Sequence, residues 1–204
     1  LYKIIPVTAD EPDGVVDGVV MDVSYDNSPE TNVNRLSPIQ CISVDDSLLF
    51  VSCQGGLWQH YTTLEYHEMP GQVQLWNTNS MSLDTTIQFS WTSSPWHITK
   101  SPTKDEVFVA LSGSGSANDP ENSSVACLTY SSSDVSIKWH TYFNEYLGLH
   151  GIDVSSDGQR LFVSGREDKK LHILDTESGA KLKSILLGDD RDNIEPAGLS
   201  VVDK

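Results

Sequence analysis

The sequence predicts an all-β fold built from repeated four-stranded antiparallel meanders, and three observations support this prediction. First, residues 148–188 contain short apolar runs separated by polar turns, one of which holds the Asp157-Gly158 pair that tight hairpins favour. Second, related stretches recur upstream at intervals of about fifty residues. Third, no stretch has the apolar stripe of period 3.6 that marks a packed helix.

The repeats align through a short motif that starts each meander. Residues 98–111 align without a gap with residues 152–165, and residues 41–53 repeat the theme with a hairpin shortened by two residues. Residues 196–202 begin the pattern again and stop. The matching positions are Ile42, Ile98, Ile152 and Leu199. Four-stranded meanders repeated at this interval are the blade units of a β-propeller.

This repeat pattern divides the chain into an N-terminal segment and a series of propeller blades. We expect residues 36–204 to form the blades, at about 36–92, 93–145 and 146–190, with the start of a further blade at 194–204. Residues 1–35 are candidates for the outer strands of a preceding blade. Because propellers close with four to eight blades, we expect a partial or fragmentary propeller. The alternative is a closed ring of four blades, completed by residues 1–24.

The motifs of the last full repeat resemble a known repeat family. An Ile-x-Val start, a Ser-x-Asp-Gly turn, a Leu-Phe-Val-Ser strand and an Ile-Leu-Asp-Thr-x-Ser-Gly exit resemble the YVTN-type (surface-layer-like) propeller repeat. Residues 71–77 also resemble the exit strand of a WD repeat. The resemblance covers about residues 36–204 and implies an extracytoplasmic protein (secreted, periplasmic or on the cell surface), because YVTN relatives are commonly exported. It does not imply one activity, because propellers host many functions.

Composition and charge exclude several classes of function. The formal net charge of −16 and the isoelectric point near 4.5 oppose binding to nucleic acid. The chain contains no apolar run long enough to span a membrane, so we expect no membrane insertion. It lacks a G-x-S-x-G nucleophile motif. It also lacks a recognisable signal peptide and begins with Leu1, from which we expect a trimmed product or a piece of a longer protein.

The strongest candidates for metal binding are His97 and His150. They lie one and two residues before Ile98 and Ile152, where the chain starts the innermost strand at the mouth of the propeller channel. In this respect the chain resembles the propeller domains of nitrous oxide reductase and of haem d1 nitrite reductase, which implies copper or non-covalent haem as the cofactor. A metal site needs three or four ligands, and the offset turns the two rings in different directions. The alternative is two histidines packed at blade junctions.

An insertion at residues 55–71 supplies further candidates. It separates the second and third strands of the first repeat and is rich in aromatic and imidazole side chains. Together with Trp96, these side chains are candidates for a partner-binding surface, because aromatic residues dominate protein interfaces. His60 and His67 are alternative ligands beside His97. The candidate binding residues are Trp58, His60, Tyr61, Tyr66, His67 and Trp96.

Other side chains give weaker signals. The three cysteines form no C-x-x-C motif, and a bridge between Cys41 and Cys53 is one alternative for strands of a single hairpin. Phe162 is expected in the core of its blade, and His172 on an outer strand.

These observations lead to a functional hypothesis with two alternatives. We expect a non-catalytic propeller module that binds or scaffolds a protein partner, within a longer propeller or a larger complex. The first alternative is the propeller domain of a metal- or haem-dependent oxidoreductase. The second is an intracellular WD-like assembly platform, for which Trp76 is the main support.

Overall fold

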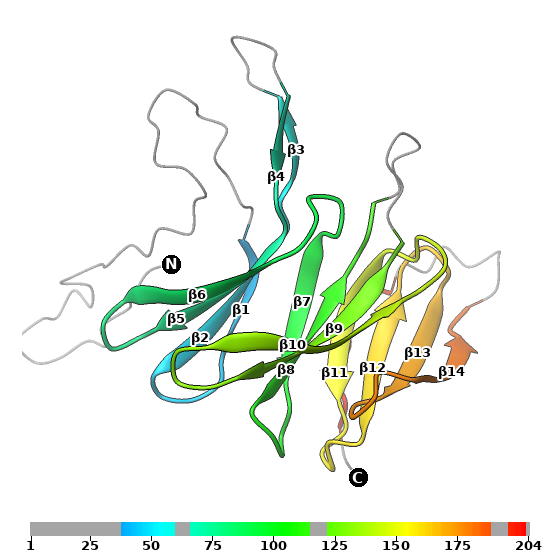
Figure 1. The fold of residues 1–204 in the computed structure, drawn as a ribbon. Coiled ribbons are helices and arrows are strands. Elements are labelled where there is room, and N and C mark those ends of the chain that lie inside the picture. Colours follow the sequence, from blue (N-terminus) through cyan, green and yellow to red (C-terminus); the bar gives the residue numbers. More distant parts are fainter. Residues whose placement is uncertain (1–37, 60–65, 115–121, 189–195, 203–204) are drawn as a thin grey trace, which may run out of the picture.

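Three four-stranded antiparallel sheets account for most of the described chain, which confirms the all-β prediction (Figure 1). The computed structural model describes residues 38–59, 66–114, 122–188 and 196–202, with only the backbone for 57–59, 66 and 67. Within these ranges no helix occurs, and therefore none that could span a membrane.

Each sheet is one propeller blade in which the strands lie side by side in chain order. Blade 1 consists of β1 (Pro38–Ser43), β2 (Leu48–Cys53), β5 (Gln72–Asn77) and β6 (Ser82–Gln88). Blade 2 consists of β7 (Pro95–Lys100), β8 (Glu106–Leu111), β9 (Ser124–Tyr130) and β10 (Val135–Tyr142). Blade 3 consists of β11 (Leu149–Val154), β12 (Arg160–Gly165), β13 (Lys170–Asp175) and β14 (Lys181–Leu186). A separate hairpin of β3 (Gly56–Gln59) and β4 (Tyr66–Met69) interrupts blade 1.

The turn residues explain why the chain folds back at these points. Gly158 adopts a φ of 72° in the β11–β12 turn, a conformation that glycine adopts without steric cost. The neighbouring Asp157 carboxylate accepts a hydrogen bond from the Gln159 amide at 2.9 Å. In the β13–β14 turn the Asp175 carboxylate accepts one from the Ser178 amide, also at 2.9 Å. These local bonds close the hairpins that the sequence predicts.

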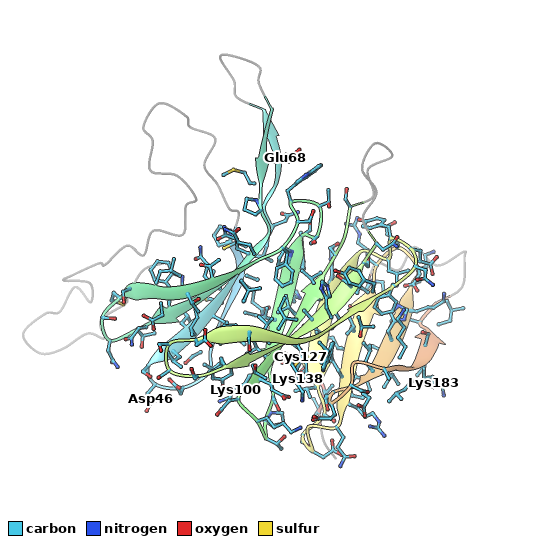
Figure 2. The ribbon with its side chains drawn as sticks, viewed as in Figure 1. Asp46, Glu68, Lys100, Cys127, Lys138 and Lys183 are labelled. Atoms are coloured by element: carbon cyan, nitrogen blue, oxygen red, sulfur yellow. The ribbon has the colours of Figure 1, made fainter. Side chains whose placement is uncertain are left out.

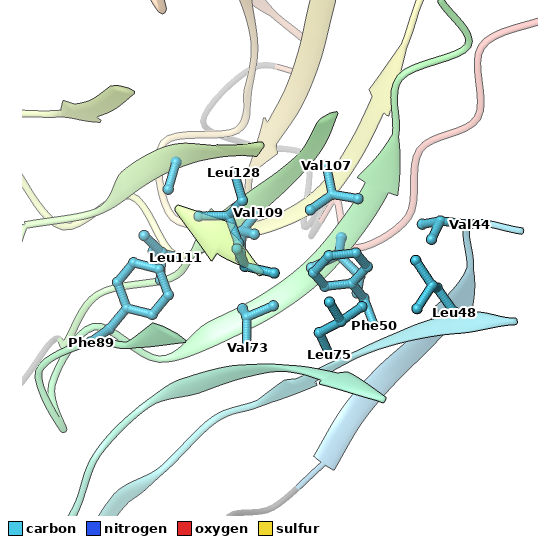
Figure 3. Packing of buried hydrophobic residues seen from close by; sticks show 13 residues of the cluster. Val44, Leu48, Phe50, Val73, Leu75, Phe89, Val107, Val109, Leu111 and Leu128 are labelled. Carbon is cyan, nitrogen blue, oxygen red and sulfur yellow. The ribbon is translucent and has the colours of Figure 1, made fainter. Parts of the chain in front are cut away.

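Apolar side chains join each blade to the next. Between blades 1 and 2, Phe50 and Leu75 of one sheet face Val107 and Val109 of the other, and all four are completely buried (Figure 3). Between blades 2 and 3 a second cluster includes Phe108 and Leu161. Because both faces of blade 2 are covered, its strands β8 and β9 consist mainly of apolar residues.

The innermost strands β1, β7 and β11 are neighbours in space, as expected at the centre of a propeller (Figure 1). The Gln40 side-chain oxygen accepts a hydrogen bond from the Ile98 amide at 2.7 Å, which links β1 to β7. The Thr99 hydroxyl donates to the Asp153 carboxylate at 3.2 Å, which links β7 to β11.

The register of blade 1 corrects the sequence alignment by one residue. Ile98 lies opposite Val109 and Ile152 opposite Val163, whereas the equivalent Val51 lies opposite Cys41. The counterpart of Ile98 and Ile152 is therefore Cys41, and the predicted match with Ile42 is wrong. A shift of one residue turns a side chain to the other face of the sheet, so Ile42 faces blade 2 instead.

The bridge between Cys41 and Cys53, which the sequence left as an alternative, does not form, because all three cysteines are free. Cys41 lies opposite Val51, and Cys53 lies opposite Pro38. The two thiols are therefore offset along the hairpin, whereas a disulfide needs close and facing Cβ atoms.

Candidate functional site

One end of the blades collects most of the predicted site residues. The first residue of each inner strand pairs with the last residue of the second strand, in the pairs Pro38–Cys53, Pro95–Leu111 and Leu149–Gly165. The insertions of blades 1 and 2 leave from these same second-strand ends. We call this end the channel-mouth edge and define it by residues 38–40, 95–97 and 149–151. Loops that share one end of a rigid scaffold are common sites of binding.

A register shift shared by β7 and β11 determines the direction of the side chains at this edge. The pairing of β7 shifts register between Pro95 and Ile98, and that of β11 shifts between Leu149 and Ile152. Trp96 and His150 therefore occupy equivalent positions within these bulges, and the counterpart of His97 is Gly151. Bulges of this kind redirect side chains.

Trp96 and His150 stack across the junction of blades 2 and 3. Their ring centroids lie 4.4 Å apart, and the ring planes differ by 9°. Both side chains are half-buried. The structure thus joins a residue predicted to bind a partner with a residue predicted to bind a metal, and one face of the imidazole is covered by the indole.

His97 is half-buried, and burial lowers the pKa of its imidazole. The ring is therefore neutral at neutral pH, which is the form that coordinates metals. However, no three His, Cys, Asp or Glu side chains converge among the residues that the structure describes. The described residues therefore supply no site with three such ligands. His60 lies outside the described residues, and only the backbone of His67 is described.

The β3–β4 hairpin carries the remaining candidates and projects beyond the blades at the channel-mouth edge (Figure 1). The backbone of Trp58 lies opposite that of His67, and Tyr66 lies opposite Gln59. Tyr61 lies outside the described residues. At the base, Gly55 has a φ of 68°, and a Cβ atom there would lie 2.4 Å from the Met69 carbonyl oxygen. Only glycine permits this close approach where the hairpin leaves the blade.

Sequence reasoning missed a polar group inside blade 3. His172 is buried, its Nδ1 lies 2.9 Å from the Ser184 hydroxyl, and its Nε2 lies 3.1 Å from Asp168 Oδ2. Apart from this contact, the buried Nε2 and Oδ2 atoms have no hydrogen-bond partner among the described residues. Burial lowers the pKa of the His172 imidazole, and the Asp168 carboxylate opposes this shift. The sequence could have predicted this burial, because His172 and the apolar Leu174 are two residues apart and alternate residues of a strand share one face.

A second polar group ties blades 2 and 3 together at the opposite end of the strands. The Lys138 ammonium lies 2.8 Å from both the Glu106 and the Glu177 carboxylates, and Lys104 also pairs with Glu177. Hydrogen bonds from these two lysines lower the pKa of the Glu177 carboxyl to about 2. The Trp139 indole donates to the Thr176 carbonyl oxygen at 2.9 Å beside them. No local motif predicts these contacts, because their partners are distant in sequence.

The comparisons with known proteins identify the fold and no family. No protein-family model and no curated protein sequence matches the chain. Among solved structures, a putative 6-phosphogluconolactonase from Bacteroides fragilis is similar with a TM-score of 0.60 at 15% identity, over 99% of this chain and 51% of that protein. The β-propeller domain of Cps50 (Swd1) from Myceliophteria thermophila is similar with a TM-score of 0.54 at 7% identity, over 79% of this chain and 43% of that one. Hydrazine synthase from Kuenenia stuttgartiensis has a TM-score of 0.51 at 10% identity, over 77% and 63% of the two chains.

These similarities support the β-propeller architecture and do not select one activity, since a fold hosts many functions. The chain spans between 43% and 63% of the length of these three structures.

Proposed function

We propose that this chain is a non-catalytic β-propeller module that binds or scaffolds a protein partner through its channel-mouth edge. The stack of Trp96 on His150 is the observation that carries the proposal. It places a half-buried tryptophan at the channel-mouth edge, where the insertions of blades 1 and 2 begin. Tryptophan is enriched among the residues that dominate binding energy at protein interfaces.

The β3–β4 hairpin extends this surface in the proposal. Its backbone pairing places Trp58 and His67 next to each other on strands that project from the same edge. A rigid set of blades with a projecting hairpin suits a binding module, because the blades fix the position of the contacting groups. Trp96 and the hairpin residues Trp58, His60, Tyr61, Tyr66 and His67 form the proposed contact surface.

The proposal also concerns the longer protein that contains this module and its cellular location. We propose that the remaining blades of a longer propeller complete the fold, since this chain spans about half of the propeller structures that it resembles. Membership of the YVTN-type family and an extracytoplasmic location rest on the resemblance of the repeats. Fractionation of the source cells tests the location directly.

The test is a comparison of partner capture by matched variants. The chain is immobilised, bound proteins are quantified by mass spectrometry, and Trp96→Ala is compared with the parent. We expect the partner signal to fall at least tenfold, the effect of losing a tryptophan hot spot. Leu83→Ala, at an exposed apolar position near the opposite end of blade 1, is the control. Equal capture by all three proteins would contradict the proposal.

A metal- or haem-dependent oxidoreductase is the second candidate, favoured by the presence of His97 and His150 on the neighbouring inner strands β7 and β11. In that case these imidazoles would hold copper or non-covalent haem, and the metal or haem would supply the redox chemistry. The double variant His97→Ala, His150→Ala would then lose metal uptake, measured as bound metal per chain. Unchanged metal content in the variant would reject this candidate.

A further inference from the structure

The three blades carry equivalent faces on the side that meets the following blade. A phenylalanine stands at the same place in the second strand of each blade, and an apolar residue of the third strand lies opposite it. These pairs are Phe50–Leu75, Phe108–Cys127 and Phe162–Ile173. Two residues along, the pairs Ser52–Val73, Ala110–Val125 and Ser164–Leu171 lie on the same face.

Within the part of the chain that the structure describes, another blade covers only two of these faces. Phe50 and Phe108 are 0% exposed, because blades 2 and 3 pack on them. Phe162, which we expected in the core, is half-buried, as are Ile173 and Leu171. Ile185 lies opposite Leu171 on β14 and is 38% exposed. We call Phe162, Leu171, Ile173 and Ile185 the blade 3 acceptor face.

The segment 196–202 runs beside β11 on this side. The Val201 amide donates to Asp153 Oδ2 at 2.6 Å, while the other Asp153 oxygen accepts from Thr99 of β7. A Cβ atom on Gly151 would lie 2.9 Å from the Leu199 nitrogen, so glycine is required for this approach. The segment thus flanks β11 on one side as β7 flanks it on the other, which is the position of the inner strand of a next blade.

The outer strand of blade 3 also matches that of blade 2. Trp139 lies opposite Cys127, and its indole donates to Thr176 of the following blade. Lys183 lies opposite Ile173 at the equivalent position of β14, at the edge of the molecule away from blades 1 and 2 (Figure 2). Its ammonium is therefore placed to donate to a carbonyl or carboxylate oxygen of a following blade.

We propose that the blade 3 acceptor face binds a further four-stranded blade of the same polypeptide, whose innermost strand includes residues 196–202. The occupant would present a mainly aliphatic sheet face like the one that blade 3 turns toward blade 2, which includes Ile152, Val154, Leu161, Val163 and Leu174. This inference rests on the proposed propeller module and specifies where that propeller continues.

The test supplies such a blade. Residues 149–188 are repeated after Glu195, so that the second copy of Leu149 replaces Pro196 and the second Ile152 takes the place of Leu199. We expect one cooperative transition, a Tm raised by more than about 5 °C and reduced binding of the apolar dye anilinonaphthalene sulfonate. Ile185→Lys in the first copy should abolish the gain in Tm. Leu186→Lys, one residue along and on the opposite face, should keep it.

Several results would overturn the inference. The added blade could unfold in a separate transition, or the Tm could stay unchanged. Ile185→Lys and Leu186→Lys could also change the Tm equally. A dimer of the unextended chain that Ile185→Lys dissociates would assign the face to a second copy instead. Dye binding that rises only after deletion of residues 1–35 would assign it to that segment. Partner capture by the Trp96→Ala variant is measured independently of the added blade. A negative result for the blade 3 acceptor face therefore does not contradict the proposed function.

Discussion

The indole of Trp96 and the imidazole of His150 stack nearly parallel, with ring centroids 4.4 Å apart. They occupy equivalent bulged positions of consecutive inner strands, so the stack follows from the repeat itself. Repetition of one strand register brings the two side chains together across a blade junction.

A double-mutant cycle on Trp96 and His150 measures this stack. We expect Trp96→Ala and His150→Ala to be non-additive, with a coupling free energy of about 0.5–1.5 kcal/mol from urea unfolding. His150→Phe should retain most of the coupling, because a planar ring remains. Strict additivity would show that the rings do not interact in solution.

Two equivalent phenylalanines should respond differently to truncation. Phe108→Ala should cost about 3–5 kcal/mol of unfolding free energy, since Phe108 is 0% exposed between two blades. Phe162→Ala should cost clearly less, because Phe162 is half-buried on the acceptor face. Denaturant unfolding of the two variants gives the comparison, and equal losses would contradict the assigned blade order.

Cysteine reactivity should separate the three thiols. Cys41 is exposed, whereas burial raises the pKa of the Cys53 and Cys127 thiols to about 12. We expect one thiol to react rapidly with a disulfide reagent in the native protein, and all three to react in denaturant. Cys41→Ser should remove the rapid phase. A native protein without any reactive thiol would support the bridge that the structure lacks.

Stability should fall on mild acidification because of His172. Its folded pKa lies below the unfolded value of about 6.5, so the unfolded state binds more protons in this range. The stabilisation is therefore complete above about pH 6.5 and decreases as the pH falls toward the lowered pKa. His97 contributes with the same sign. Denaturant unfolding from pH 7.5 to 5 should show a shallower decrease in His172→Phe than in the parent, and identical slopes would contradict this assignment.

The contacts of Glu177 with Lys104 and Lys138 should contribute a small, salt-dependent amount to the stability of the fold. Because Glu177 is exposed, Glu177→Gln should lower Tm only slightly, and the difference should shrink in concentrated salt. The folded pKa near 2 means that the contribution is present above the unfolded pKa of about 4.5 and is lost as the pH falls toward 2. The measurement is thermal unfolding of both proteins at low and high ionic strength. A difference that grows with salt would exclude an ionic origin.

The fold was predictable because the turn residues and the strand pattern of each repeat agree. Asp157 and Gly158 close a hairpin by local hydrogen bonds, which a sequence reveals directly. The register of β1 was not predictable, because Cys41 and Ile42 are both apolar and either could face the preceding blade. Pairing with Val51 decides between them, and pairing depends on the whole sheet.

The candidate site was predictable only in part. The sequence predicted His97, His150 and Trp96 as site residues but did not match Trp96 with His150, and their contact depends on the spacing between blades. The contacts of Glu177 with Lys104 and Lys138 also join different blades, and no sequence pattern relates such residues. His172 differs, because its alternation with Leu174 was visible in the sequence, although we expected His172 on an outer strand and it is buried.

The most direct test of a non-catalytic binding module is elemental analysis of the purified native protein, with an optical spectrum of the same sample. Our account predicts less than stoichiometric copper and iron and no absorption bands of haem. Stoichiometric copper, or a haem band that disappears in the variant His97→Ala, His150→Ala, would contradict it and assign these histidines to an oxidoreductase site.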